Sequence, residues 1–104
     1  MTNTTQGEPD LRSERGEVLS RVTFEKDQVI FPEGEESTDA FVIESGCVGV
    51  FKAVEGRLVK LATMEKGSVF GEMAAVTGAR RSATAMAVEP TVVVRISGAI
   101  VQNR

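Results

Sequence analysis

The chain has 104 residues, 41% of them hydrophobic and 26% charged, which predicts a single globular domain with a modest hydrophobic core. Its net charge of −3 argues against the clustered basic surface that binding to nucleic acids or to anionic membranes requires. With no histidine and one cysteine, the sequence excludes a histidine-based catalytic dyad or triad, a zinc or iron–sulfur site and a histidine-ligated haem.

The N-terminal segment carries few structural signals. Residues 1–10 are polar and are expected to form a disordered tail without a secretory signal. Within residues 11–21, Leu11, Val18 and Leu19 follow a weak helical spacing, which predicts a short N-terminal helix. The single cysteine fits a reducing compartment and no apolar run is long enough to span a membrane, so we expect a cytoplasmic protein.

From residue 22 onward, short β-rich runs alternate with turn residues. The pair Glu55-Gly56 predicts a tight hairpin turn, because Gly56 can adopt a positive φ angle. The pattern as a whole is typical of a mainly β fold, an eight-stranded antiparallel jelly roll, also called a double-stranded β-helix. The expected strands cover residues 21–25, 28–31, 40–45, 47–54, 57–64, 68–70, 82–87 and 91–96.

One segment interrupts this β pattern. Residues 72–77 begin with EMAA, which strongly favours a helix, and they lie between Gly71 and Gly78. A single helical turn inside a β domain is unusual. We therefore expect the functional site at this helix.

The residues around the expected helix suit a ligand that carries both a sugar and a phosphate. Gly71 has no side chain, so a ligand can approach its backbone closely. Free N–H groups at the helix start and the planar guanidinium of Arg81 can both bind phosphate oxygens. The Glu72 carboxylate can accept hydrogen bonds from sugar hydroxyls, and the small residues Ser82 and Ala83 leave space for a ring.

These residues resemble a known motif. Residues 70–74 (FGEMA), followed after six residues by 81–84 (RSAT), are similar to the phosphate-binding cassette of cyclic nucleotide-binding domains. That family includes regulatory subunits of cyclic-AMP-dependent kinase, the catabolite activator protein and cyclic-nucleotide-gated channels. Segments between residues 24 and 67 resemble the family's earlier strands and turns, so the resemblance covers residues 22–96.

The resemblance implies a non-enzymatic sensor or regulatory domain that binds a cyclic nucleotide and needs no metal or cofactor. It implies that Arg81 pairs with the phosphate and that Glu72 binds the ribose 2′-hydroxyl. Cyclic AMP is favoured over cyclic GMP, because Ser82 stands where relatives that prefer cyclic GMP often carry threonine. No residue is expected to be catalytic. The expected ligand-binding residues are Phe70, Gly71, Glu72, Met73, Ala74, Arg81, Ser82, Ala83 and, at the base, Leu61.

The segment after the last expected strand is short. Residues 97–104 are expected to form a C-terminal tail without the full lid helix that commonly covers the base in the family. A second copy of the chain in a homodimer, or an effector partner, would then supply the cover. The chain would alternatively be a fragment of a larger cyclic-AMP-responsive regulator.

Other interpretations compete with this one. A metal-dependent cupin enzyme shares the jelly-roll architecture but depends on histidine ligands, which this chain lacks. A degenerate jelly-roll interaction module that no longer binds nucleotide is the main alternative, and the presence of Glu72 and Arg81 argues against it. Leu61 fits an ordinary core position equally well, and the acidic run at residues 33–36 is expected to be a solvated loop.

Overall fold

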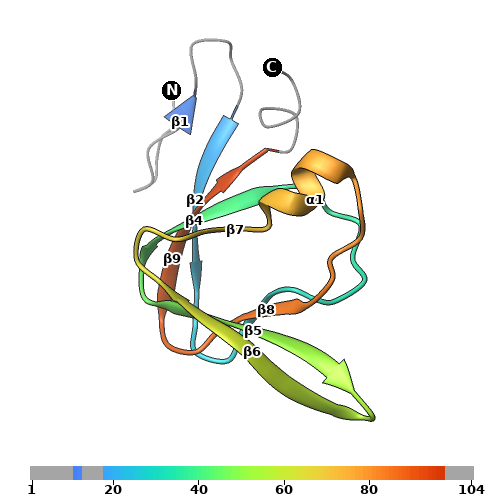
Figure 1. The fold of residues 1–104 in the computed structure, drawn as a ribbon. Coiled ribbons are helices and arrows are strands. Elements are labelled where there is room, and N and C mark those ends of the chain that lie inside the picture. The colour runs from blue at the N-terminus through green and yellow to red at the C-terminus, as the bar shows by residue number, and fades with distance from the viewer. Residues whose placement is uncertain (1–10, 13–17, 98–104) are drawn as a thin grey trace.

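The computed structural model describes residues 11–12 and 18–97, which form two antiparallel β-sheets and one short helix (Figure 1). The five-stranded sheet has the order β1-β2-β9-β4-β7, and the four-stranded sheet has the order β3-β8-β5-β6. The helix α1 (Glu72–Thr77) connects β7 to β8. The strands are β1 (Leu11–Arg12), β2 (Val18–Phe24), β3 (Val29–Phe31), β4 (Ala40–Ser45), β5 (Cys47–Val54), β6 (Arg57–Glu65), β7 (Val69–Phe70), β8 (Thr84–Ala87) and β9 (Thr91–Ile96).

The burial of side chains alternates along the strands. In β9, Thr91 and Val93 are buried, while Val92 and Val94 between and beyond them are partly exposed. The same period of two buries a pair of alanines in β8. Successive side chains of a strand point to opposite faces, so each strand covers the core with one face.

The hairpin between β5 and β6 has the tight turn that the sequence predicts. Val54 pairs with Arg57, and the two residues between them, Glu55 and Gly56, have φ angles of 50° and 82°. Two positive φ angles match the right-handed twist of the flanking strands. The tip of this hairpin extends away from the rest of the fold (Figure 1).

The core lies between the two sheets and is centred on three phenylalanines. Phe41 and Phe70 stack with ring centroids 5.2 Å apart, and Phe31 lies 5.8 Å from Phe41 and 6.0 Å from Phe70. These distances are in the range where aromatic pairs attract each other beyond simple burial. Ile43, Val48, Ala85 and Val93 complete the buried cluster.

The fold class is confirmed, but the predicted N-terminal helix over residues 11–21 is wrong where it can be compared. Leu11–Arg12 is a strand that pairs with β2, and Val18–Phe24 is a strand that pairs along its length with β9. Tertiary pairing with the distant strand β9 overrides the weak helical spacing, because propensity over a short segment is a weak signal beside a six-residue ladder. Residues 13–17, the tail predicted at residues 1–10, and all but the first residue of the tail predicted at 97–104 lie outside the described residues.

No helix within residues 11–12 and 18–97 has both the length and the apolar character needed to cross a membrane.

Candidate functional site

The helix α1 begins and ends as the sequence predicts. It runs from Glu72 to Thr77 and is preceded by Gly71, whose φ angle of 82° lies in the left-handed region that side chains disfavour. At the other end, the N–H of Gly78 donates to the carbonyl of Ala74 at 2.7 Å. The two glycines let the chain enter and leave a six-residue helix between two strands.

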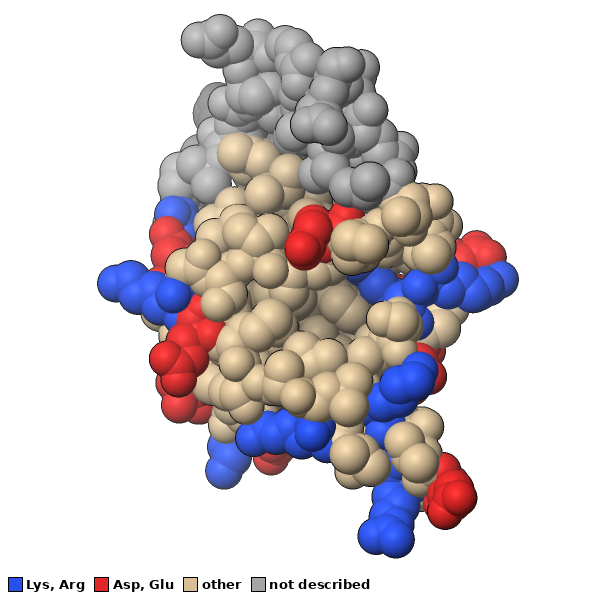
Figure 2. Space-filling view, in the orientation of Figure 1, with Lys and Arg blue, Asp and Glu red and all other residues tan. Residues whose placement is uncertain are grey.

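A cavity of about 490 Å³ lies beside α1 and opens to solvent. Figure 2 shows it as a hollow in a face that is largely uncharged, with basic side chains along one edge. The size and the mostly apolar walls are typical of small-molecule sites. It is lined by Phe31, Val50, Met64, Val69, Phe70, Gly71, Glu72, Met73, Ala74, Thr77, Ala79, Arg80, Arg81, Ser82, Ala83 and Ala85.

Arg81 is a buried cation in the wall of this cavity. Its side chain is 4% exposed, and its guanidinium carbon lies 4.0 Å from the centre of the Phe31 ring. Nη1 donates to the carbonyl of Gly71 at 2.9 Å, and Nη2 donates to the carbonyl of Asp39 at 2.6 Å. A longer bond of 3.3 Å joins Nη2 to the Ser37 hydroxyl.

Two features make the Arg81 guanidinium suitable for binding an anion. Its Nε is buried and has no hydrogen-bond partner among the described residues. Burial lowers the pKa of the guanidinium, and the nearby carboxylates of Glu35 and Asp39 oppose that shift. Arginine nevertheless stays charged in proteins, so the cavity wall carries a positive charge that is poorly solvated. An anion in the cavity would offset that cost.

The backbone of Arg81 forms hydrogen bonds with the turn after β3. The N–H of Gly34 donates to the carbonyl of Arg81 at 2.8 Å, and the N–H of Arg81 donates to the carbonyl of Glu35 at 2.9 Å. The acidic run at residues 33–36 is an exposed to half-buried loop, as expected, and its backbone also holds Arg81. Arg80 differs from Arg81: its side chain is 64% exposed and pairs with Glu36 at 2.5 Å.

The structure brings eight of the nine predicted ligand-binding residues to the cavity. Phe70, Ala74 and Ala83 contribute buried side chains, whereas Met73 is 67% exposed at the rim. Glu72 and Ser82 are also exposed and line the cavity. The lining residues are Phe70, Gly71, Glu72, Met73, Ala74, Arg81, Ser82 and Ala83.

Leu61 is the predicted residue that the structure does not bring there. It is 57% exposed and is absent from the cavity lining. Leu61 lies in the edge strand β6, where every residue except Met64 is exposed, and a register shift leaves it without a partner in β5. The apolar wall comes instead from residues that the sequence did not single out, including Phe31, Val50, Met64 and Ala85. The sequence placed these residues in expected strands and gave no signal that they contact a ligand.

The described residues offer little for metal or thiol chemistry. Across residues 11–12 and 18–97, no group of three or more histidine, cysteine, aspartate or glutamate side chains is arranged to hold a metal ion. Burial raises the pKa of the Cys47 thiol, with Glu89 and Glu65 adding to the shift, so the thiol stays protonated at neutral pH.

Comparison with known proteins identifies related sequences and structures. A family model described as "Cyclic nucleotide-binding domain" matches residues 21–103. The cAMP-dependent protein kinase regulatory subunit of Debaryomyces hansenii is 37% identical over 82 residues, which are 79% of this chain and 18% of that protein. The chain thus spans less than a fifth of that kinase subunit.

Solved structures show the same architecture. The EAL enzyme Bd1971 in its cAMP-bound form is similar with a TM-score of 0.78 and 32% identity, over 82% of this chain and 23% of that chain. The same enzyme is also known in a cGMP-bound form, with the same TM-score of 0.78. The catabolite activator protein of Thermus thermophilus is similar with a TM-score of 0.73 and 30% identity, over 77% of this chain and 38% of that chain.

Proposed function

The chain belongs to the cyclic nucleotide-binding domain family, and we propose that it is a non-enzymatic regulatory module that binds cyclic AMP in the cavity beside α1. The observation that carries this proposal is the buried Arg81, a cation in the lining of a cavity with apolar sides, whose Nε has no hydrogen-bond partner among the described residues. A cyclic nucleotide combines an anionic phosphate with an apolar ring system, which suits this pairing of a buried cation with an apolar wall.

Each part of the ligand has a proposed partner. Arg81 pairs with the phosphate, and Gly71 lets the phosphate approach the backbone. Glu72 accepts a hydrogen bond from the ribose 2′-hydroxyl. The purine rests against the apolar wall that includes Val50 and Met64. No metal or cofactor takes part in this proposal.

Titration calorimetry with cyclic AMP tests the function directly. We expect cyclic AMP to bind more tightly than cyclic GMP, because this chain has a serine, Ser82, where relatives that prefer cyclic GMP often have a threonine. A linear 5′-AMP control is expected to bind far more weakly, since it carries a different phosphate geometry. Tighter binding of cyclic GMP would overturn the ligand preference. Absence of binding to either cyclic nucleotide would instead favour a jelly-roll interaction module that has lost its ligand.

The proposed sugar contact predicts a specific coupling between Glu72 and the ligand. A 2′-deoxy cyclic AMP is expected to bind the wild-type chain at least about 10-fold more weakly than cyclic AMP, because one hydrogen bond to a charged group is lost. In the Glu72→Ala variant, the two ligands are expected to bind equally. Calorimetry of both ligands with both proteins completes a double-mutant cycle, and additive effects would contradict the pairing.

The open side of the cavity suggests a covering partner. Val69 and Met73 both line the cavity and are 52% and 67% exposed, so a bound purine would leave an apolar rim in water. We propose that a covering segment packs on this rim, contributed by a second copy of the chain, by an effector or by further sequence. We also propose a cytoplasmic location, since the free Cys47 suits a reducing compartment.

A further inference from the structure

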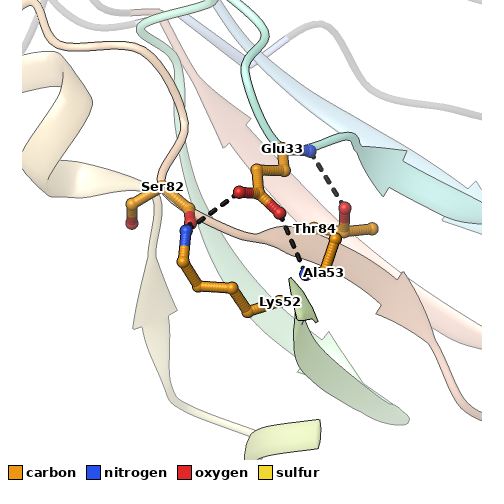
Figure 3. A network of polar contacts seen from close by, with 5 residues as sticks. All are labelled: Glu33, Lys52, Ala53, Ser82 and Thr84. Atoms are coloured by element: carbon orange, nitrogen blue, oxygen red, sulfur yellow. Dashed lines mark hydrogen bonds and ion pairs between the residues drawn. The ribbon is translucent and has the colours of Figure 1, made fainter. Parts of the chain in front are cut away.

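A network of polar contacts links the end of the cassette to two other segments (Figure 3). From β5, the Lys52 ammonium donates to the carbonyl of Ser82 at 2.8 Å and to Oε2 of Glu33 at 2.9 Å. Oε1 of Glu33 accepts a bond of 3.2 Å from the N–H of Ala53. The N–H of Glu33 donates to the hydroxyl of Thr84 at 2.9 Å. The network therefore joins the turn after β3, the strand β5 and the chain that enters β8.

The two charged residues act on the cavity from outside it. Neither Glu33 nor Lys52 lines the cavity, whereas Ser82 and Ala83 both do. The carbonyl of Ser82 and the N–H of Ala83 belong to one planar peptide group, so a bond that fixes the carbonyl also fixes the N–H. Ser82 directly follows Arg81, and the same bond therefore restrains the backbone that carries the buried guanidinium.

The contacts around Glu33 distinguish it from an ordinary surface carboxylate. The Lys52 and Glu33 side chains are 44% and 31% exposed, and each has a second partner within the network. Hydrogen bonds from Lys52 and from the backbone of Ala53 hold the pKa of Glu33 below its ordinary value. The carboxylate is therefore charged at neutral pH, and it accepts bonds from both Lys52 and the backbone of Ala53.

We propose that the Glu33–Lys52 ion pair positions the Ser82–Ala83 peptide for the ligand and so sets ligand affinity from outside the cavity. The inference rests on the proposed function, because cyclic AMP is the ligand whose affinity changes. Without the Lys52 ammonium, the Ser82 carbonyl loses this bond and the peptide gains freedom to rotate. Binding must then order that peptide, which weakens the affinity.

The test measures the affinity of single variants for cyclic AMP by calorimetry. Lys52→Met keeps the length of the side chain but removes the donor, and it is expected to weaken binding about 3- to 10-fold. Glu33→Gln is expected to have a similar effect. The affinity of the double variant for cyclic AMP is expected to equal that of the single variant that binds more weakly, because both changes break one network. Lys52→Arg keeps a charged donor and is expected to restore most of the affinity.

Two matched variants separate positioning from a general loss of stability. Glu44→Gln breaks an ion pair with Arg21, whose nitrogens donate to the Glu44 carboxylate at 2.6 and 3.0 Å on the other sheet. Lys60→Met removes an exposed lysine from the neighbouring strand β6. Both variants are expected to bind cyclic AMP with unchanged affinity, even if their midpoint of thermal unfolding falls. The amide resonance of Ala83 in the unliganded protein is expected to shift in Lys52→Met and not in Glu44→Gln.

The outcomes separate this inference from the proposed function. If the wild-type chain binds cyclic AMP and Lys52→Met binds it equally well, the positioning role is overturned and the proposed function stands. If the wild-type chain binds no cyclic nucleotide, the proposed function fails and the inference fails with it. Additive losses in the double variant would show that Glu33 and Lys52 act separately, which would overturn the role of the ion pair.

Discussion

Replacement of Arg81 by alanine is expected to weaken cyclic AMP binding about 10- to 150-fold, which corresponds to about 1.5–3 kcal/mol. The guanidinium is 4% exposed in the cavity wall, and its Nε has no partner among the described residues. Without it, a bound phosphate would be partly desolvated and would lack its counter-charge. Calorimetry at one fixed salt concentration measures the change.

The design must separate ligand binding from folding, because Arg81 also donates to the carbonyls of Gly71 and Asp39. Arg81→Lys keeps the charge without the planar fork, and it is expected to bind cyclic AMP better than Arg81→Ala but worse than the wild type. Arg80→Ala removes the same charge from an exposed pair one residue away, and a loss of less than about 3-fold is expected. Equal losses at both positions would show that net charge, rather than a specific contact, governs binding.

Replacement of Gly71 by alanine is expected to damage both the fold and the site. Gly71 has a φ angle of 82°, and an added Cβ would lie 2.9 Å from Nη1 of Arg81 and 3.1 Å from the carbonyl oxygen of Asp39. Holding an alanine in this left-handed conformation is by itself expected to lower the free energy of unfolding by about 1–3 kcal/mol. Because Arg81 must also move, cyclic AMP binding is expected to weaken by more than about tenfold. Chemical denaturation and calorimetry measure the two effects.

Gly67 provides a matched control for the strain of placing an alanine at a positive φ angle. Its φ angle is 91°, and an added Cβ would meet no atom within 4 Å. Gly67→Ala is therefore expected to lower stability through backbone strain while leaving the affinity for cyclic AMP unchanged. If Gly71→Ala bound cyclic AMP as tightly as Gly67→Ala, the close approach of Arg81 to Gly71 would not be needed for binding.

Local sequence signals were sufficient for most of the secondary structure. The predicted ranges 40–45, 47–54 and 91–96 coincide with β4, β5 and β9, and the predicted helix over 72–77 coincides with α1. These elements are marked by short β-rich runs between turn residues or by flanking glycines, and both signals act over a few residues. Local signals gave a wrong prediction for the N-terminal segment, because its conformation depends on pairing between β2 and the distant strand β9.

Short contiguous patterns in the sequence were enough to predict the fold class and the helix α1, because both depend on neighbouring residues. The tertiary structure decided the rest of the site. Phe31, Val50 and Met64 reach the cavity from three separate strands, whereas Leu61 is exposed on the edge strand β6 and does not line it. The Lys52 ammonium donates a hydrogen bond to the carbonyl of Ser82, which lies 30 residues further along the chain. Such contacts depend on strand register and on how the two sheets face each other, and a shift of one residue in register would turn each side chain to the opposite face.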